Sequence, residues 1–224
     1  MLMSLCDVYF EREGHRILSD VNLTVDRGDF MAITGPNGGG KTTMLRLILG
    51  LLKPTAGKIV YYDEQGKPAS HPRFGYLPQK NSVDSHFPIT VREVVESALL
   101  PYSTLSSAEK RDQVDAALDK IEMSALQHRP IGNLSGGQLQ RALFARAIVS
   151  APPVLVLDEP LSYLDKHFEQ HLYRIIADMA PSTTIVLVSH EMSQIAGMAN
   201  RHIIVDHTLH ECVAEHHWQR SECE

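Results

Sequence analysis

Several features are scarce in this sequence, and each scarcity excludes a class of protein. No apolar run reaches the roughly 20 residues that a membrane helix needs, because the most apolar stretch, 142–157, is interrupted by Arg146 and by a Pro-Pro pair. The first residues carry no positive segment ahead of an apolar one, so we predict no secretory signal and a cytoplasmic location. Three widely spread cysteines are too few for a disulfide framework.

Positive charge is also in short supply. The 21 Lys and Arg are outnumbered by 27 Asp and Glu, which gives a formal net charge of -6 and argues against a nucleic-acid partner. The 224 residues, 43% of them hydrophobic and 21% charged, have the balance of an ordinary globular protein and suffice for a core of normal depth. We therefore expect a single domain, 1–224.

The hydrophobic pattern predicts an α/β fold. Short strands are expected at 5–10, 17–25, 30–34, 57–62, 74–77, 154–157, 183–188 and 202–205, and helices at 41–52, 90–100, 106–123, 138–149 and 166–179. Wholly apolar strands that alternate with helices indicate a mainly parallel sheet covered on both faces. The helical middle, about 81–150, is interpreted as a subdomain inserted into this core.

A glycine-rich segment after the strand at 30–34 predicts phosphate binding. Gly35, Pro36, Asn37, Gly38, Gly39, Gly40, Lys41 and Thr42 fit the pattern G-x-x-x-x-G-K-[ST], and both the preceding strand and the following helix that this pattern requires are predicted. Glycines allow backbone N–H groups to turn toward phosphate oxygens, and the helix directs its positive end at the same anion. Lys41 is expected on the β- and γ-phosphates of ATP and Thr42 on Mg²⁺, with Thr43 beside them.

Two carboxylates follow the apolar strand at 154–157, where parallel strands end and ligands bind. Asp158 is expected near Mg²⁺, and Glu159 is expected to polarise a water for attack on the γ-phosphate. Alone, the pair would also fit an acidic turn. Beside a phosphate loop it predicts ATP hydrolysis rather than binding alone.

The segment Leu134, Ser135, Gly136, Gly137, Gln138 opens a predicted helix, and with it the sequence resembles the ATP-binding subunits of ABC transporters over essentially the whole chain. The resemblance also rests on Gln79, on 161–165 and on His190, all in the family's order. It implies a P-loop NTPase core with an N-terminal antiparallel β subdomain. A Ser-Gly-Gly helix start is a second anion site in a chain that already has one, and the family resolves this by a two-fold homodimer in which Ser135, Gly136 and Gly137 close over the partner's ATP.

The resemblance implies further roles. Gln79 resembles the residue that contacts Mg²⁺ or the attacking water, His190 resembles the γ-phosphate sensor, and Asp165 resembles a residue that contacts the partner protomer, although it would equally serve as a helix N-cap. Arg12 stands where the family usually has an adenine-stacking aromatic, with Phe10 as the alternative. Gly39 replaces the loop's common serine, and Tyr163 replaces a small residue.

The segment from 74 to 95 looks most like the subfamily that imports zinc, manganese or chelated iron. Such a subunit would lie peripherally on the inner face of the cell membrane and drive separate permease subunits through a surface around 81–95. Transport of another solute, and a soluble ABC ATPase of a cofactor-assembly or cell-division complex, are the alternatives. Five histidines and two cysteines near the end suit Zn²⁺, but their spacing matches no standard zinc site, and a solvated, poorly ordered end is the favoured interpretation.

Overall fold

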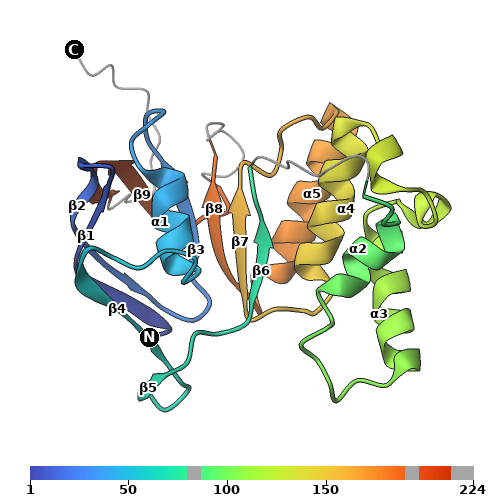
Figure 1. The fold of residues 1–224 in the computed structure, drawn as a ribbon, viewed down its shortest axis with the longest axis horizontal. Coiled ribbons are helices and arrows are strands. Elements are labelled where there is room, and N and C mark those ends of the chain that lie inside the picture. The colour runs from blue at the N-terminus through green and yellow to red at the C-terminus, as the bar shows by residue number, and fades with distance from the viewer. Residues whose placement is uncertain (80–86, 190–196, 213–224) are drawn as a thin grey trace.

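In the computed structural model, which describes residues 1–79, 87–189 and 197–212, the chain forms two sheets and a group of helices (Figure 1). The strands are β1 (Met3–Arg12), β2 (His15–Val25), β3 (Phe30–Thr34), β4 (Ala56–Tyr62), β5 (Pro68–Ala69), β6 (Phe74–Leu77), β7 (Val154–Asp158), β8 (Thr184–Val188), β9 (Arg201–Asp206) and β10 (Thr208–Cys212). The helices are α1 (Lys41–Ile48), α2 (Val91–Ser97), α3 (Ser107–Lys120), α4 (Gly136–Ile148) and α5 (Lys166–Met179), with 3₁₀ turns η1 (Ser124–Leu126) and η2 (Ile131–Asn133).

The larger sheet has six strands in the order β10-β9-β3-β8-β7-β6. Its strands pair in parallel except for β10, which returns antiparallel beside β9. Every residue of β7 and β8 is buried, as their unbroken apolar runs require when both faces of a sheet are covered. One face packs on α4 and α5, and the other on α1 and the N-terminal strands.

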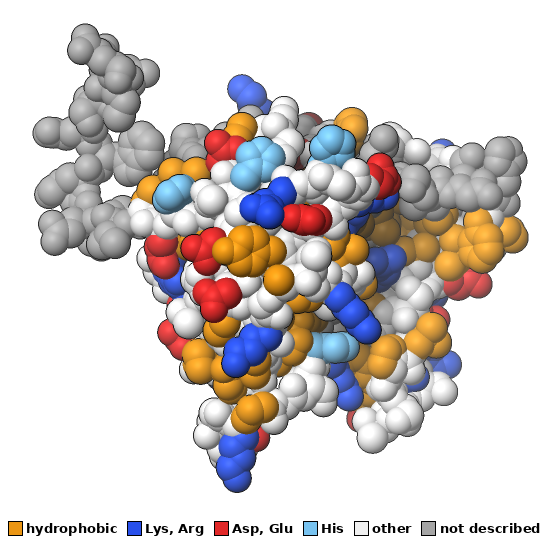
Figure 2. All heavy atoms as spheres, turned by 60° about the vertical axis from the view of Figure 1, so that its left-hand side comes forward, with side chains coloured by type: hydrophobic (Ala, Val, Ile, Leu, Met, Phe, Trp, Pro, Cys, Tyr) orange, Lys and Arg blue, Asp and Glu red, His pale blue; other side chains and the backbone are white. Residues whose placement is uncertain are grey.

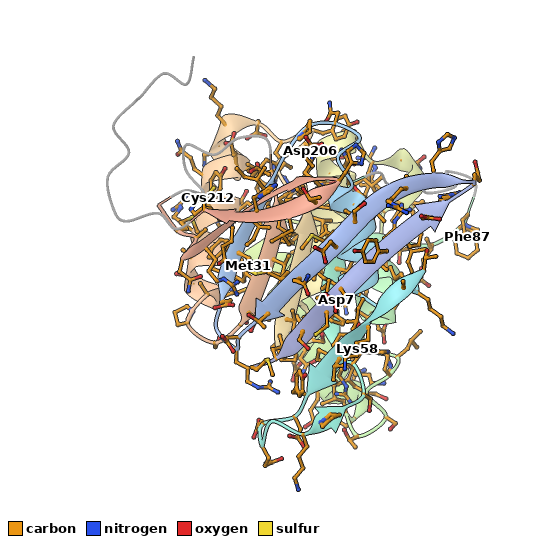
Figure 3. The ribbon with its side chains drawn as sticks, turned by 90° about the vertical axis from the view of Figure 1, so that its left-hand side faces the viewer. Asp7, Met31, Lys58, Phe87, Asp206 and Cys212 are labelled. Carbon is orange, nitrogen blue, oxygen red and sulfur yellow. The ribbon has the colours of Figure 1, made fainter. Side chains whose placement is uncertain are left out.

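The smaller sheet is antiparallel, with the order β2-β1-β4-β5. Asp7 and Lys58 lie on its neighbouring strands in Figure 3, while Met31 lies on β3 of the larger sheet behind them. The sheet buries Leu5, Val8 and other alternate residues of β1 and β2 against α1. The predicted α/β class, with a mainly parallel core and an N-terminal antiparallel part, is confirmed.

The helical region, on the right of Figure 1, is built on local sequence signals. Helix α2 begins after Thr90 and α3 after Ser106. At each start, the capping residue and the glutamate three residues later form a capping box. These helices pack on α4 through buried apolar residues such as Val95, Val114 and Phe144. Helices α2, α3 and α4 lie within the region expected at about 81–150, whose exact limits stay a prediction.

Parallel pairing brings the carboxyl ends of the core strands to one edge. The phosphate loop leaves β3 there, Gln79 follows β6, and Glu159 follows β7. Ser189 follows β8, and His190 lies outside the described residues. Among the helices of the described ranges, none is long and apolar enough to cross a membrane.

Residues 201–212, the described part of the histidine-rich end, differ from the expectation of a poorly ordered tail, which the described residues do not test beyond Cys212. Residues 208–212 form β10, and their register places Cys212 opposite His202. A double ion pair from Arg201 to Glu211 stabilises this register. The sequence did not predict β10, because this edge strand buries little on either face and therefore lacks an apolar pattern.

Candidate functional site

Glycines give the phosphate loop its shape. Gly35, Gly38 and Gly40 have φ values of 138°, 84° and 100°, which favour residues without a side chain. At Gly35 a Cβ would lie 2.0 Å from the carbonyl oxygen of Val205, and at Gly39 it would lie 2.7 Å from the same oxygen. Strand β9 therefore approaches the loop so closely that only glycine fits at both positions.

The turn between β9 and β10 holds the phosphate loop from outside. The backbone N–H of His207 donates to the carbonyl of Gly39 at 2.9 Å, and the N–H of Ser19 donates to the carbonyl of His207 at 2.7 Å. The His207 ring places Nδ1 3.1 Å from the carbonyl of Ile17. Asp206, labelled in Figure 3, marks this turn. The loop is thus fixed to the β9–β10 hairpin, which is in turn bonded to β2.

Lys41 is the first residue of α1 and is almost fully buried. Its ammonium donates to the carbonyls of Gly35 and Pro36, both at 2.8 Å. This contact holds a positive charge against the phosphate loop, next to the N-terminus of α1. Both features favour an anion there.

Asp158 ends β7 with 1% of its surface exposed. Its Oδ2 accepts a hydrogen bond from the Thr42 hydroxyl at 3.1 Å, whereas its buried Oδ1 has no hydrogen-bond partner among the described residues. Burial raises the pKa of this carboxyl and the neighbouring charge of Glu159 adds to the rise, while the Thr42 hydroxyl lowers it. An orphaned carboxylate oxygen beside a hydroxyl suits the oxygen-ligand chemistry of Mg²⁺.

A pocket of about 280 Å³ brings the first group of predicted residues together. Glu159, at the left-handed φ of 51°, and Gln79 face the phosphate loop across it. Its lining comprises Ile17, Asn37, Gly38, Gly40, Lys41, Thr42, Thr43, Gln79 and Glu159. The phosphate loop, the acidic pair and Gln79 thus form one site.

Arg12 is not part of that lining. It lies at the end of β1 with an exposed side chain whose Nε is 3.6 Å from Glu13. Ile17 on β2 reaches the pocket instead. Sequence analysis did not assign Ile17, Val205 or His207 to this site, and counted His207 only among the histidines near the end, because contacts between distant strands leave no local pattern. Ile17 is partly buried and also packs on the edge of the core cluster that contains Leu18.

The serine-glycine segment forms a second, separate pocket of about 710 Å³. Ser135 is the N-cap of α4, and Gln138 completes a capping box by accepting the Ser135 N–H at 3.1 Å. Tyr163 lies over Gly136 with 79% of its surface exposed. No residue of this lining belongs to the phosphate pocket in the described part of the chain.

Asp165 lies on the rim of the second pocket and acts as the N-cap of α5. Its Oδ1 accepts the backbone N–H of Phe168 at 2.8 Å, and Arg141 lies 3.4 Å from its Oδ2. The Phe168 hydrogen bond lowers the pKa of this exposed carboxyl. The N-cap interpretation is confirmed, and the partner contact stays a prediction.

Comparison with known proteins identifies a family whose sequence model covers both pockets' motifs. The family model described as "ABC transporter" matches residues 18–162, which include both pockets' motifs. The zinc uptake system ATP-binding protein ZurA of Listeria monocytogenes is 37% identical, over 94% of this chain and 87% of its own. The zinc import ATP-binding protein ZnuC of Pseudomonas aeruginosa is 34% identical, over 96% and 74%.

Among solved structures, a dimeric ATP-binding cassette in a post-hydrolysis state with ADP and phosphate is 27% identical with a TM-score of 0.82. The similarity covers 94% of this chain and 97% of that one. With the phosphate loop, the acidic pair and the serine-glycine helix start all inside the matched region, this chain belongs to the ABC transporter family, as a subunit that binds and hydrolyses ATP.

Proposed function

We propose that this chain energises the uptake of a metal ion, zinc or manganese, through separate membrane permease subunits. The observation that carries the proposal is the 37% identity to a zinc uptake ATP-binding protein over nearly the full length of both chains. As the subunit that supplies ATP hydrolysis to membrane-embedded permeases, the chain would then lie peripherally on the inner face of the membrane.

The phosphate pocket supports a division of labour in hydrolysis. Lys41 and the loop N–H groups would hold the β- and γ-phosphates, while Thr42 and Asp158, with Gln79 beside them, would hold Mg²⁺. When bound, the cation neutralises charge on the transferring phosphoryl group. Glu159, held in a strained backbone conformation that active sites commonly store, would take the proton of the attacking water. His190 is proposed as the γ-phosphate sensor and lies outside the described residues.

The second pocket supports a homodimer as the active form. Its α4 N-terminus offers the Ser135 hydroxyl and the N–H groups of Gly136 and Gly137 to an anion that the same chain's phosphate loop does not supply. A two-fold pairing would place each such segment over the partner's ATP, as an isologous interface does. Gln138 would hold this turn in shape through its capping box.

Uptake of radioactive zinc and manganese by cells that lack this chain tests the proposal. We expect uptake to fall and to recover with the wild-type chain, but not with Glu159→Gln. Glu13→Gln, at an exposed hairpin position, serves as the matched control and should restore uptake. Unchanged uptake of both metals, with loss of another solute, would refute the metal assignment and leave the ATPase assignment intact.

A further inference from the structure

Three consecutive glycines, Gly38, Gly39 and Gly40, form the middle of the phosphate loop. Glycine leaves the backbone free to adopt many conformations, so a run of three has little conformational preference of its own. The N–H groups of this segment can hold a phosphate only if they keep pointing toward it. Contacts from outside the loop must therefore fix its course.

Two strands that are far apart in the sequence enclose this glycine segment. At Gly39 a Cβ atom would lie 2.7 Å from the carbonyl oxygen of Val205 on β9. At Gly40 it would lie 3.2 Å from the carbonyl oxygen of Ile17 on β2, and 2.7 Å from the side chain of Leu18. The loop thus passes between β9 and β2, which approach it closely from two sides.

His207 joins these two strands around the loop. It lies in the turn between β9 and β10, and its backbone N–H donates to the carbonyl of Gly39 at 2.9 Å. Its carbonyl accepts the N–H of Ser19 on β2 at 2.7 Å, and its ring Nδ1 lies 3.1 Å from the carbonyl of Ile17. One residue therefore contacts the glycine segment and β2 at the same time.

The ring contact of His207 depends on where the ring carries its proton. A carbonyl oxygen can only accept, so the contact with Ile17 is a hydrogen bond only when Nδ1 is protonated. The other ring nitrogen, Nε2, lies 3.9 Å from the carboxylate of Asp206, and the His207 side chain is 57% exposed. Figure 2 shows histidine side chains at the surface near the top of the molecule, among charged ones. Because water competes for an exposed hydrogen bond, we expect a modest contribution from it.

The contacts of His207 reach two parts of the phosphate pocket. Ile17 belongs to the lining, and Gly39 lies between Gly38 and Gly40, which also belong to it. A change at His207 would therefore alter the spacing between β2 and the loop. Glu159 follows β7 and Gln79 follows β6, so the groups expected to act on the attacking water are held by other elements.

We propose that His207 is a positioning residue for nucleotide binding. Together with Val205 and Ile17 it forms a clamp, which we call the loop clamp, that keeps the glycine segment between β9 and β2 and its N–H groups directed at the phosphates. The inference goes beyond the proposed function, because it rests on nucleotide binding in the phosphate pocket and not on which solute is carried. Loosening the loop clamp weakens nucleotide affinity and spares the chemical step.

Equilibrium titration with ADP tests the loop clamp, because ADP binding requires no hydrolysis. Gly and Asn both tolerate the left-handed backbone of position 207, where φ is 55°, but only Asn can donate a hydrogen bond from near the place of Nδ1. His207→Gly should weaken ADP binding about three- to tenfold, and His207→Asn should recover most of the affinity. With ATP, His207→Gly should raise KM and leave kcat within about twofold of the wild-type value.

Glu211→Gln is the matched control. It removes the ion pair to Arg201 in the same hairpin, and neither residue lines the phosphate pocket. Thermal unfolding of each variant measures the loss of stability. Glu211→Gln should lower the melting temperature and still bind ADP as the wild type does. Wild-type affinity in His207→Gly, no recovery in His207→Asn, or an affinity loss in Glu211→Gln that follows its loss of stability would each overturn the inference.

Nitrogen NMR of the imidazole rings tests the ring contact without altering the protein. In the neutral ring of His207 the proton should be on Nδ1, and the absence of this signal from His207→Asn assigns it. A neutral ring protonated on Nε2 would leave the carbonyl of Ile17 without this donor and would overturn the inference even if His207→Gly failed to fold. If metal uptake proves to be the wrong function, the ADP titration and the NMR measurement still decide the role of His207.

Discussion

The phosphate pocket and the serine-glycine pocket both present helix N-termini to an anion, but the chain completes only the first. The phosphate loop is fixed by Val205 and His207 and holds a buried lysine at its centre. In the serine-glycine turn the capping box satisfies the N–H groups of Ser135 and Gln138, and the turn lies under an exposed tyrosine. One half of the ATP site is thus finished by intramolecular packing, and the other is left for a second molecule to complete.

The largest effect is expected from a substitution that removes the catalytic base and leaves both halves of the ATP site in place. Glu159→Gln should reduce ATP turnover about 10²- to 10⁴-fold, since it removes the base but no phosphate contact. It should still bind ATP and accumulate as a dimer, whereas the wild type should show weak basal activity that rises with protein concentration. Turnover assays and size-exclusion chromatography with ATP would measure both. Near-normal hydrolysis by purified Glu159→Gln would eliminate Glu159 as the base.

The next two substitutions distinguish the phosphate pocket from the serine-glycine pocket by their different effects on ATP binding and hydrolysis. Lys41→Ala should lose about 10- to 100-fold or more in nucleotide affinity, because it removes a charge-assisted phosphate contact. Ser135→Arg should bind ATP normally yet fail to hydrolyse it, because it blocks only the site on the partner.

Mixing the two inactive variants sharpens this test. A mixed dimer contains one site with an intact loop from one protomer and an intact Ser135 from the other, so mixing should recover part of the activity. Loss of ATP binding by monomeric Ser135→Arg, measured by equilibrium titration, would show that Ser135 acts within its own chain.

Local sequence predicted the backbone of both halves well, because each of the following elements is determined by residues close together in the sequence. The glycines fit left-handed backbone, the apolar run of β7 fits a covered parallel strand, and Ser135 with Gln138 fits a capping box. The roles of Gln79, His190 and Arg12 came from resemblance and stay predictions. Strand β10 escaped prediction because its residues are mostly polar, and the contacts of Val205 and His207 escaped it because they join segments more than 150 residues apart.

The third effect concerns the packing of β9 against the phosphate loop, the half of the ATP site that the chain completes by itself. Gly39→Ala should destabilise the fold by about 1–3 kcal/mol, because the new Cβ would lie 2.7 Å from the Val205 carbonyl oxygen. Gly38→Ala is the control: it has open space around it and a φ of 84°, so it should cost only the left-handed conformation. Thermal unfolding compares the two. If Gly39→Ala were as stable as the wild type, the close approach of β9 would not hold the loop.

A change of pH should alter the stability contributions of one carboxyl from each half of the ATP site, Asp158 and Asp165, in opposite directions. We expect this effect to be smaller than those above. Burial raises the folded-state pKa of Asp158 above that of the unfolded chain, so its ionisation increasingly opposes folding as the pH rises from the ordinary Asp pKa to the raised one, and fully above it. Without Mg²⁺ and nucleotide, Asp158→Asn should therefore stabilise the protein at neutral pH, with the gain fading as the pH falls toward 3.8.

Asp165 should behave in the opposite way. Its pKa is lowered by the Phe168 hydrogen bond, so its charge favours folding above the ordinary Asp pKa, and this contribution is lost as the pH falls through the folded pKa. Asp165→Asn should slightly destabilise the protein at neutral pH. Melting temperatures across pH for the two variants would check both signs, and shifts of the same sign would contradict the contrast.

The smallest expected effect concerns metal binding at the end of the chain, next to the hairpin that fixes the phosphate loop. Within the described residues no three His, Cys, Asp or Glu side chains converge as a metal site, although His202 and Cys212 are paired across β9 and β10. His216, His217 and Cys223 lie outside the described residues.

Calorimetric titration with Zn²⁺ and Mn²⁺ should compare the full chain with one that ends after Cys212. Cutting after Val205 would remove β10 and the His207 contact to Gly39. We expect equal, weak binding, since a cross-strand pair supplies only two of the four ligands that a structural zinc site has, and Cys212→Ser should reduce what remains. Clearly tighter zinc binding by the full chain would instead assign a sensing role to the residues after Cys212.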